Sequence, residues 1–121
     1  MKYTKEHEWV KLDGDIATVG ITQHAADALG ELVYVELPES GESFEKGDAA
    51  IVVESSKSAS DVYAPVAGEI SEINDSLESA PENVNNSPYD DGWLVKIKVS
   101  DASQIDQYMS EEEYQSYIKE D

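Results

Sequence analysis

The chain has 121 residues, 40% of them hydrophobic, which suits one folded domain with a modest core. Its 27 acidic residues against 8 basic ones, all lysine, give a formal net charge of -19, which argues against binding to nucleic acids or anionic membranes and favours protein partners with basic surfaces. Because cysteine is absent, disulfides, thiolate catalysis and cysteine-based zinc sites are excluded.

The beginning of the chain predicts a hairpin. Residues 9–12 and 16–21 are short, largely apolar runs of the kind that form strands. Asp13-Gly14 lies between them, and this dipeptide readily adopts the positive φ angles of a tight turn. We therefore expect two antiparallel strands here.

A short helix and a third strand should follow. Thr22 can cap a helix that continues through residues 25–29, and Gly30 can end it because glycine tolerates left-handed backbone conformations. Residues 32–37 show the alternation of a strand, which Pro38 should halt.

The most informative feature is a single lysine between small hydroxyl side chains. Lys57 lies between Ser56 and Ser58, with one apolar run at residues 49–53 and another at residues 62–66. This order predicts strand, turn and strand, with one extended, solvated amine at the tip that is available for acylation. A charged turn residue that only keeps the loop soluble is the alternative interpretation.

The second half of the chain predicts further strands. Residues 68–73 resemble residues 30–35 in their Gly-Glu start and apolar pattern, which suggests two similar β halves. Residues 74–91 are rich in Asn, Ser, Pro and Asp and indicate a loop. Residues 93–99 alternate well enough to form a strand.

The C-terminal tail, residues 101–121, is expected to be helical. It contains two pairs of residues with the spacing of N-terminal capping boxes. These are Asp101 with Gln104 and Ser110 with Glu113.

Metal and hydrolytic sites find little support. His7 and His24 are the only imidazoles, too few for a metal site without cysteine, and no metalloprotease, nucleophile-elbow or phosphate-loop motif occurs. The N-terminus lacks an apolar signal region, and no stretch approaches membrane-spanning length. We expect a cytoplasmic protein, with a processed mitochondrial form as the alternative.

A series of short motifs occurs in order over most of the chain. They are His7-Glu8-Trp9, Gly20-Ile21-Thr22 with Leu29-Gly30, Val35-Glu36-Leu37-Pro38, Glu54-Ser55-Ser56-Lys57, Ser60-Asp61-Val62-Tyr63-Ala64-Pro65, Gly68-Glu69-Ile70, and Pro88-Tyr89 followed by Gly92-Trp93-Leu94-Val95-Lys96-Ile97. Each motif alone is weak, but together they resemble the H-protein family of the glycine cleavage system, whose members are lipoyl carriers.

The resemblance implies a mainly β fold. We expect a flattened barrel-sandwich hybrid of two antiparallel sheets, like that of lipoyl domains, with short helices and a helical C-terminal tail. One lipoyl-carrier domain would span residues 1–121, with residues 101–121 as a helical extension.

The same resemblance implies a carrier and not an enzyme. Lipoate joined to Lys57 by an amide would carry the aminomethyl intermediate of glycine breakdown from glycine decarboxylase to aminomethyltransferase, and dihydrolipoamide dehydrogenase would reoxidise the arm. Lipoate-attaching enzymes would be further partners. A monomer is expected, because a shuttle must present one arm to several enzymes in turn.

The resemblance also assigns surroundings to the arm. Four residues near the lysine are expected to shape the arm's environment and its recognition by modifying enzymes: Glu54, Ser56, Ser58 and Asp61. Glu8 is expected in a cleft beside the hairpin, where it and Asp61 would hold the charged amine of the cargo. No metal ligand is expected.

The chain departs from the usual family pattern in three places. Ser56 replaces valine, Ser58 replaces alanine, and Asn83 replaces an apolar residue. These changes make the neighbourhood of the lysine more polar. We expect lipoylation to survive them, because the hairpin and Glu54 are retained.

Four other functions are to be weighed against this interpretation. A biotin carrier would have methionines beside its lysine, and an acyltransferase lipoyl domain would have aspartate before it and would not explain Pro88-Tyr89 or the helical tail. A relay that supplies lipoyl groups to other carriers, and an unmodified acidic interaction module, remain as alternatives.

Overall fold

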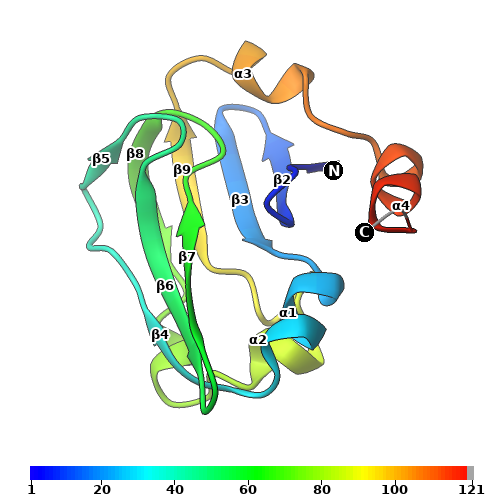
Figure 1. Ribbon diagram of the computed structural model, residues 1–121. Helices are drawn as coiled ribbons and strands as arrows, with labels where there is room; N and C mark the ends of the chain where they lie inside the picture. The colour runs from blue at the N-terminus through cyan, green and yellow to red at the C-terminus, as the bar shows by residue number, and fades with distance from the viewer. Residues whose placement is uncertain (120–121) are drawn as a thin grey trace.

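Two antiparallel β-sheets make up most of the structure, a computed structural model that describes residues 1–119 (Figure 1). The strands are β1 (Lys2–Tyr3), β2 (Glu8–Asp13), β3 (Ile16–Ile21), β4 (Leu32–Glu36), β5 (Ser43–Phe44), β6 (Ala49–Ser55), β7 (Ala59–Tyr63), β8 (Gly68–Ile73) and β9 (Val95–Val99). The helical segments are α1 (Gln23–Leu29), the 3-10 helix η1 (Asp75–Glu78), α2 (Asn83–Asn86), α3 (Ser103–Asp106) and α4 (Glu111–Lys119). Positions 120 and 121 of the predicted tail lie outside the described residues.

The two sheets face each other across one apolar core (Figure 1). The larger sheet has the order β1-β2-β3-β9-β8-β5, and the smaller has the order β4-β6-β7. Buried side chains from both sheets pack together in this core, including Val10, Val19 and Ile97 from the larger sheet and Val35 and Val53 from the smaller. Within residues 1–119 neither sheet closes on itself, so the expected two-sheet sandwich is confirmed and no closed barrel forms.

The predicted N-terminal hairpin and helix are confirmed. β2 and β3 pair along their whole length. Thr22 caps α1, because its Oγ1 accepts a hydrogen bond from the Ala25 N–H at 3.2 Å. Gly30 ends the helix with a positive φ of 87°, as expected, but its ψ of -174° is extended and lies outside the left-handed helical region.

The polar segment at residues 74–91 is more structured than predicted. It contains η1 and α2, and each buries one apolar side chain, Leu77 and Val84 respectively. The Asn74 Nδ2 donates a hydrogen bond to the Asp91 carbonyl oxygen at 2.8 Å, which ties the two ends of the segment together. Composition alone predicted a loop because the two apolar residues that anchor the segment are widely spaced.

The strands predicted in the second half of the chain are present, but their sheet membership or their bounds differ from the prediction. The two similar Gly-Glu segments both lead into strands, but β4 belongs to the smaller sheet and β8 to the larger. The strand predicted at residues 93–99 is β9, which begins at Val95. Lys98 on β9 is exposed, whereas its neighbour Ile97 is buried.

The tail is helical, and one of its two predicted capping boxes forms. The Ser110 N–H donates to Glu113 Oε1 at 2.9 Å, and the Glu113 N–H donates to Ser110 Oγ at 3.2 Å. The box predicted for Asp101 and Gln104 is wrong. The Gln104 Oε1 instead accepts the Ala67 N–H at 2.8 Å, and Asp101 Oδ1 accepts the Ser103 N–H at 3.1 Å.

The tail packs against the N-terminal strand. Tyr3 and Met109 exchange two backbone hydrogen bonds of 2.9 Å, and the Tyr3 ring stacks on the Tyr114 ring with centroids 4.8 Å apart. The Tyr114 hydroxyl also bonds to Thr22 Oγ1 at 2.7 Å, which links α4 to the start of α1. No helix in residues 1–119 is long and apolar enough to cross a membrane.

Candidate functional site

The β6–β7 hairpin carries Lys57 at its tip. The two strands pair as far as Glu54 opposite Ala59, and the hairpin runs to the end of the molecule where α1 and α2 lie (Figure 1). The second strand was predicted at residues 62–66 and is found at β7. The ladder continues almost to the turn, and it ends before Pro65 because proline has no N–H to donate.

Ser55 organises the turn, although the sequence did not single it out. Its N–H donates to the Ser58 carbonyl oxygen at 2.8 Å, and its Oγ accepts the N–H groups of Lys57 at 3.3 Å and Ser58 at 3.2 Å. A serine hydroxyl that accepts backbone N–H groups just ahead of it stabilises a turn. Within residues 1–119, the hydroxyls of Ser56 and Ser58 form no hydrogen bond with another protein group.

Lys57 is exposed. Its side chain was predicted to extend into solvent, but it lies against the backbone of Gly30 instead. A Cβ atom built on Gly30 would lie 3.1 Å from Lys57 Cε and 3.6 Å from Nζ, so the lysine side chain lies across the glycine that ends α1. Among the described residues no carboxylate forms an ion pair with the Lys57 ammonium group. The amine is therefore accessible and unpaired, which fits a site of acylation.

Asn85 holds the segment against which Lys57 rests. Its Nδ2 donates to the carbonyl oxygens of Gly30 at 2.8 Å and Ala26 at 3.3 Å, and its Oδ1 accepts the Leu32 N–H at 2.9 Å. One side chain thus provides hydrogen-bond partners for backbone groups at the end of α1 and at the start of β4. In the sequence this asparagine indicated only a loop.

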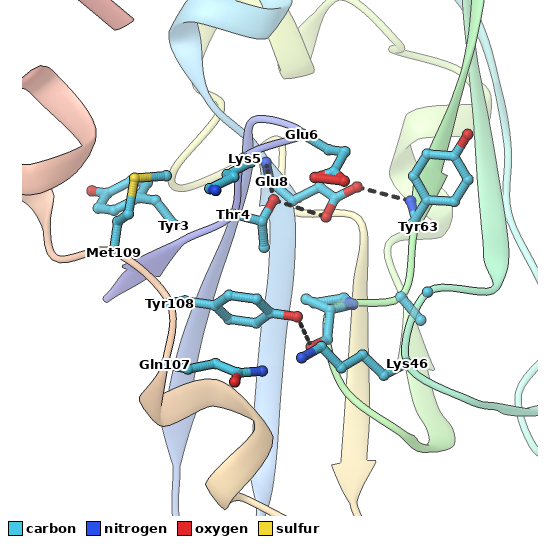
Figure 2. Close-up of a pocket in the computed structure, with 13 residues that line it drawn as sticks. Tyr3, Thr4, Lys5, Glu6, Glu8, Lys46, Tyr63, Gln107, Tyr108 and Met109 are labelled. Atoms are coloured by element: carbon cyan, nitrogen blue, oxygen red, sulfur yellow. Dashed lines mark hydrogen bonds between the residues drawn. The ribbon is translucent and has the colours of Figure 1, made fainter. Parts of the chain in front are cut away.

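A pocket of about 380 Å³ lies beside the other end of β7 (Figure 2). Its walls come from β1, the start of β2, the end of β7 and the segment that precedes α4. Glu8 and Tyr63 line it on one side, and Lys46 and Tyr108 on the other. The Lys46 Nζ lies 5.0 Å from the centre of the Tyr108 ring.

Glu8 is the buried acid of this pocket, with 3% of its surface exposed. Its Oε1 accepts the Thr4 hydroxyl at 3.0 Å, and its Oε2 accepts the Tyr63 N–H at 2.9 Å (Figure 2). The Glu8 N–H donates back to Thr4 Oγ1 at 3.1 Å. β7 is the last strand of its sheet, so the Tyr63 N–H on its outer edge is open to this carboxylate.

Burial raises the pKa of Glu8 from its ordinary value of 4.5 to about 7. The hydrogen bonds from Tyr63 and Thr4 lower the pKa, and the charge of Glu6 raises it, but burial is the largest effect. Burial likewise raises the pKa of Tyr108 to about 12, so its hydroxyl stays protonated and donates to the Pro65 carbonyl oxygen at 2.6 Å. Glu8 can therefore exchange a proton near neutral pH.

The structure separates the predicted site residues into two places. The tip of the hairpin holds the lysine with three of them: Glu54, Ser56 and Ser58. Glu8 lines the pocket, which the run of β7 separates from the tip by roughly 15–20 Å at about 3.3 Å per residue. Asp61 lies between the two on β7, exposed, and it does not line the pocket.

Comparisons with known proteins agree over the whole chain. Residues 1–121 match the family model described as glycine cleavage H-protein. A glycine cleavage system H protein of Phenylobacterium zucineum is 52% identical over 118 residues, covering 98% of both chains. One of Staphylococcus epidermidis is 50% identical over 119 residues, covering 98% of this chain and 94% of that protein.

A solved structure is also similar. The crystal structure of a glycine cleavage system H protein from Mycobacterium marinum superposes with a TM-score of 0.89 at 35% sequence identity. The match covers 98% of this chain and 95% of that one. The architecture of the two sheets and the order of the motifs thus point to the same family.

Proposed function

The chain belongs to the glycine cleavage H-protein family, and we propose that it serves glycine cleavage as a lipoyl-bearing shuttle with Lys57 as the attachment point. The family is one of carriers and not of enzymes. The observation that carries the assignment to Lys57 is its exposed, unpaired amine at the tip of a hairpin whose turn Ser55 fixes. We take residues 1–121 as one carrier domain, with residues 101–121 as a helical extension.

The residues at the tip fit an acylated lysine. An amine with no carboxylate partner loses no ion pair when an amide replaces its charge. Lipoate supplies the disulfide chemistry, which a chain without cysteine cannot provide itself. The chain's own part is to hold the attachment point on a rigid turn and to leave it open to other proteins.

We further propose that the Glu8 pocket shelters the cargo while the carrier moves between enzymes. A buried carboxylate with a pKa near 7 becomes ionised more readily when a cationic amine enters beside it. Thr4 and Tyr63 fix the direction of both Glu8 oxygens, so such an amine would meet an oriented acceptor. Asp61, exposed on β7 between tip and pocket, would guide the amine without lining the pocket itself.

The proposed partners follow from this role. They are glycine decarboxylase, aminomethyltransferase and dihydrolipoamide dehydrogenase, together with the enzymes that attach lipoate. The net charge of -19 would draw the carrier to basic faces on these proteins and make each encounter sensitive to salt. Glu54, Ser56 and Ser58 surround the lysine and would be read by the attaching enzymes.

The experiment is modification of the apo protein by a lipoate ligase with lipoate and ATP, followed by intact-mass measurement. We expect a gain of one lipoyl group that Lys57→Arg abolishes and that the matched control Lys46→Arg retains. The loaded protein should then support glycine cleavage with the three partner enzymes. Absence of the mass gain from the unaltered chain would contradict the proposal and favour an unmodified module.

A further inference from the structure

We propose that Val33 and Tyr34, called here the β4 patch, form the contact point for an enzyme whose active-site entrance presents lysine or arginine side chains around an apolar spot. The inference rests on the proposed function and adds the surface that the carrier uses. Val33 is 56% exposed and Tyr34 is 50% exposed, the two most exposed large apolar side chains in the described chain. They are neighbours in sequence, unlike the scattered apolar residues that every surface carries.

An irregularity in the strand turns both side chains outward. In a regular strand, successive side chains point to opposite faces, so one member of a consecutive pair would be buried. Between Leu32 and Tyr34 the register of β4 against β6 shifts, and Leu32 and Val35 are buried while the two residues between them are exposed. β-Bulges of this kind re-aim side chains and are frequent beside functional sites.

The register places the β4 patch next to the lysine hairpin. Tyr34 lies opposite Glu54 on β6, and Glu54 lies opposite Ala59 on β7, so these three form one row across the smaller sheet. The row is the last one before the turn that carries Lys57. A protein that accepts the arm from this tip would therefore cover the β4 patch as well.

Carboxylates surround the β4 patch. Glu31 precedes β4 and Glu36 ends it, and both are exposed. Glu36 lies opposite Val52, which lies opposite Asp61, and this row is the second one beyond the row of Tyr34. Lys57 is the only cation in the sequence between residues 47 and 95, and acylation would remove its charge. After acylation the β4 patch is an apolar spot beside the carboxylates of Glu31, Glu36 and Glu54.

This charge distribution decides between occupants. A second copy would bring an identical acidic surface against the first, and like charges placed together oppose association. An enzyme entrance with basic side chains would instead match the carboxylates, and its apolar centre would cover Tyr34, a residue type that often carries binding energy in interfaces. Such an entrance must also admit the arm, which explains why the β4 patch and the attachment point lie together.

The test compares lipoylated proteins whose loading is verified by intact mass. The variants are the double substitution Val33→Thr with Tyr34→Ser, and Leu12→Thr as the matched control, because Leu12 is an exposed apolar residue on β2 in the other sheet. The measurement is kcat/KM of glycine decarboxylase for each loaded carrier, followed as exchange of labelled bicarbonate into glycine. Thermal unfolding of each variant verifies that it is folded.

We expect the double variant to lose about tenfold in kcat/KM, and Leu12→Thr to match the unaltered carrier. A second variant, Glu31→Lys with Glu36→Lys, should lower kcat/KM by a similar factor and weaken its dependence on salt. Equal kcat/KM for the unaltered carrier and both patch variants would overturn this inference while leaving the shuttle role intact. A dimer of the unaltered carrier that the double variant dissociates without kinetic effect would also overturn it. A loaded, unaltered carrier that supports no exchange would overturn the shuttle role itself.

Discussion

Replacement of Glu8 by glutamine should make the protein more stable at neutral pH, although it removes a group proposed to serve function. The pKa of Glu8 rises from 4.5 to about 7 on folding, so the buried carboxylate is ionised at a cost. That difference corresponds to roughly 3 kcal/mol of stability lost when Glu8 ionises in the folded protein. Glutamine avoids the charge and can still accept the Tyr63 N–H and donate to the Thr4 hydroxyl oxygen.

The sign of the pH dependence follows from the two pKa values. Below pH 4.5 Glu8 is protonated in both the folded and the unfolded chain, and between 4.5 and about 7 it is protonated in the folded chain alone. The folded chain binds the extra proton in this window, so stability falls as pH rises through it. Above about pH 7 the loss is complete.

Urea denaturation of the unaltered protein and Glu8→Gln from pH 4 to pH 8.5 would measure this effect. The variant's advantage in unfolding free energy should grow by roughly 2–3 kcal/mol across the series, with most of the change between pH 5 and 7. Taking the difference between the two proteins removes the charge repulsion that both share. Glu39→Gln is the control, because Glu39 is exposed and does not line the pocket of Glu8. A pH-independent difference between Glu8→Gln and the unaltered protein would refute the reasoning.

Two further substitutions test the segment against which the Lys57 side chain lies. Gly30→Ala should cost about 1–3 kcal/mol in urea denaturation, because φ 87° with ψ -174° is a conformation that side chains rarely adopt. If Gly30→Ala costs the same in a Lys57→Ala background, the destabilisation comes from the backbone conformation. If the cost disappears there, it comes from the contact with the lysine side chain. Asn85→Ala should destabilise the protein by about 1–3 kcal/mol, because it leaves the Leu32 N–H without its acceptor. Retained stability of Asn85→Ala would show that water replaces the amide.

Local chemistry was enough to predict much of the fold. Thr22 and Gly30 mark the two ends of α1 because capping depends on residues only a few positions apart. The capping box of Ser110 and Glu113 formed for the same reason. The box predicted at Gln104 failed because a distant backbone N–H competed for its side chain, and no local pattern carries that information.

The candidate site shows the same division. Lys57 and its hairpin could be predicted because strand and turn signals flank it directly. The partners of Glu8 could not, since Thr4 is near in sequence but Tyr63 comes from the opposite sheet. Asn85 was likewise read as a loop residue, because its role depends on α1 and β4 being folded beside it.

The turn that carries Lys57 has a consequence for how the carrier can evolve. Its shape depends on the hydroxyl and N–H of Ser55 and on backbone groups of Lys57 and Ser58, while the side chains of Ser56 and Ser58 are exposed. These two side chains are therefore free to vary without deforming the turn. Under the proposed function they are the side chains that an attaching enzyme would read beside Lys57, so substitutions there would change recognition while the turn that presents the amine stays the same.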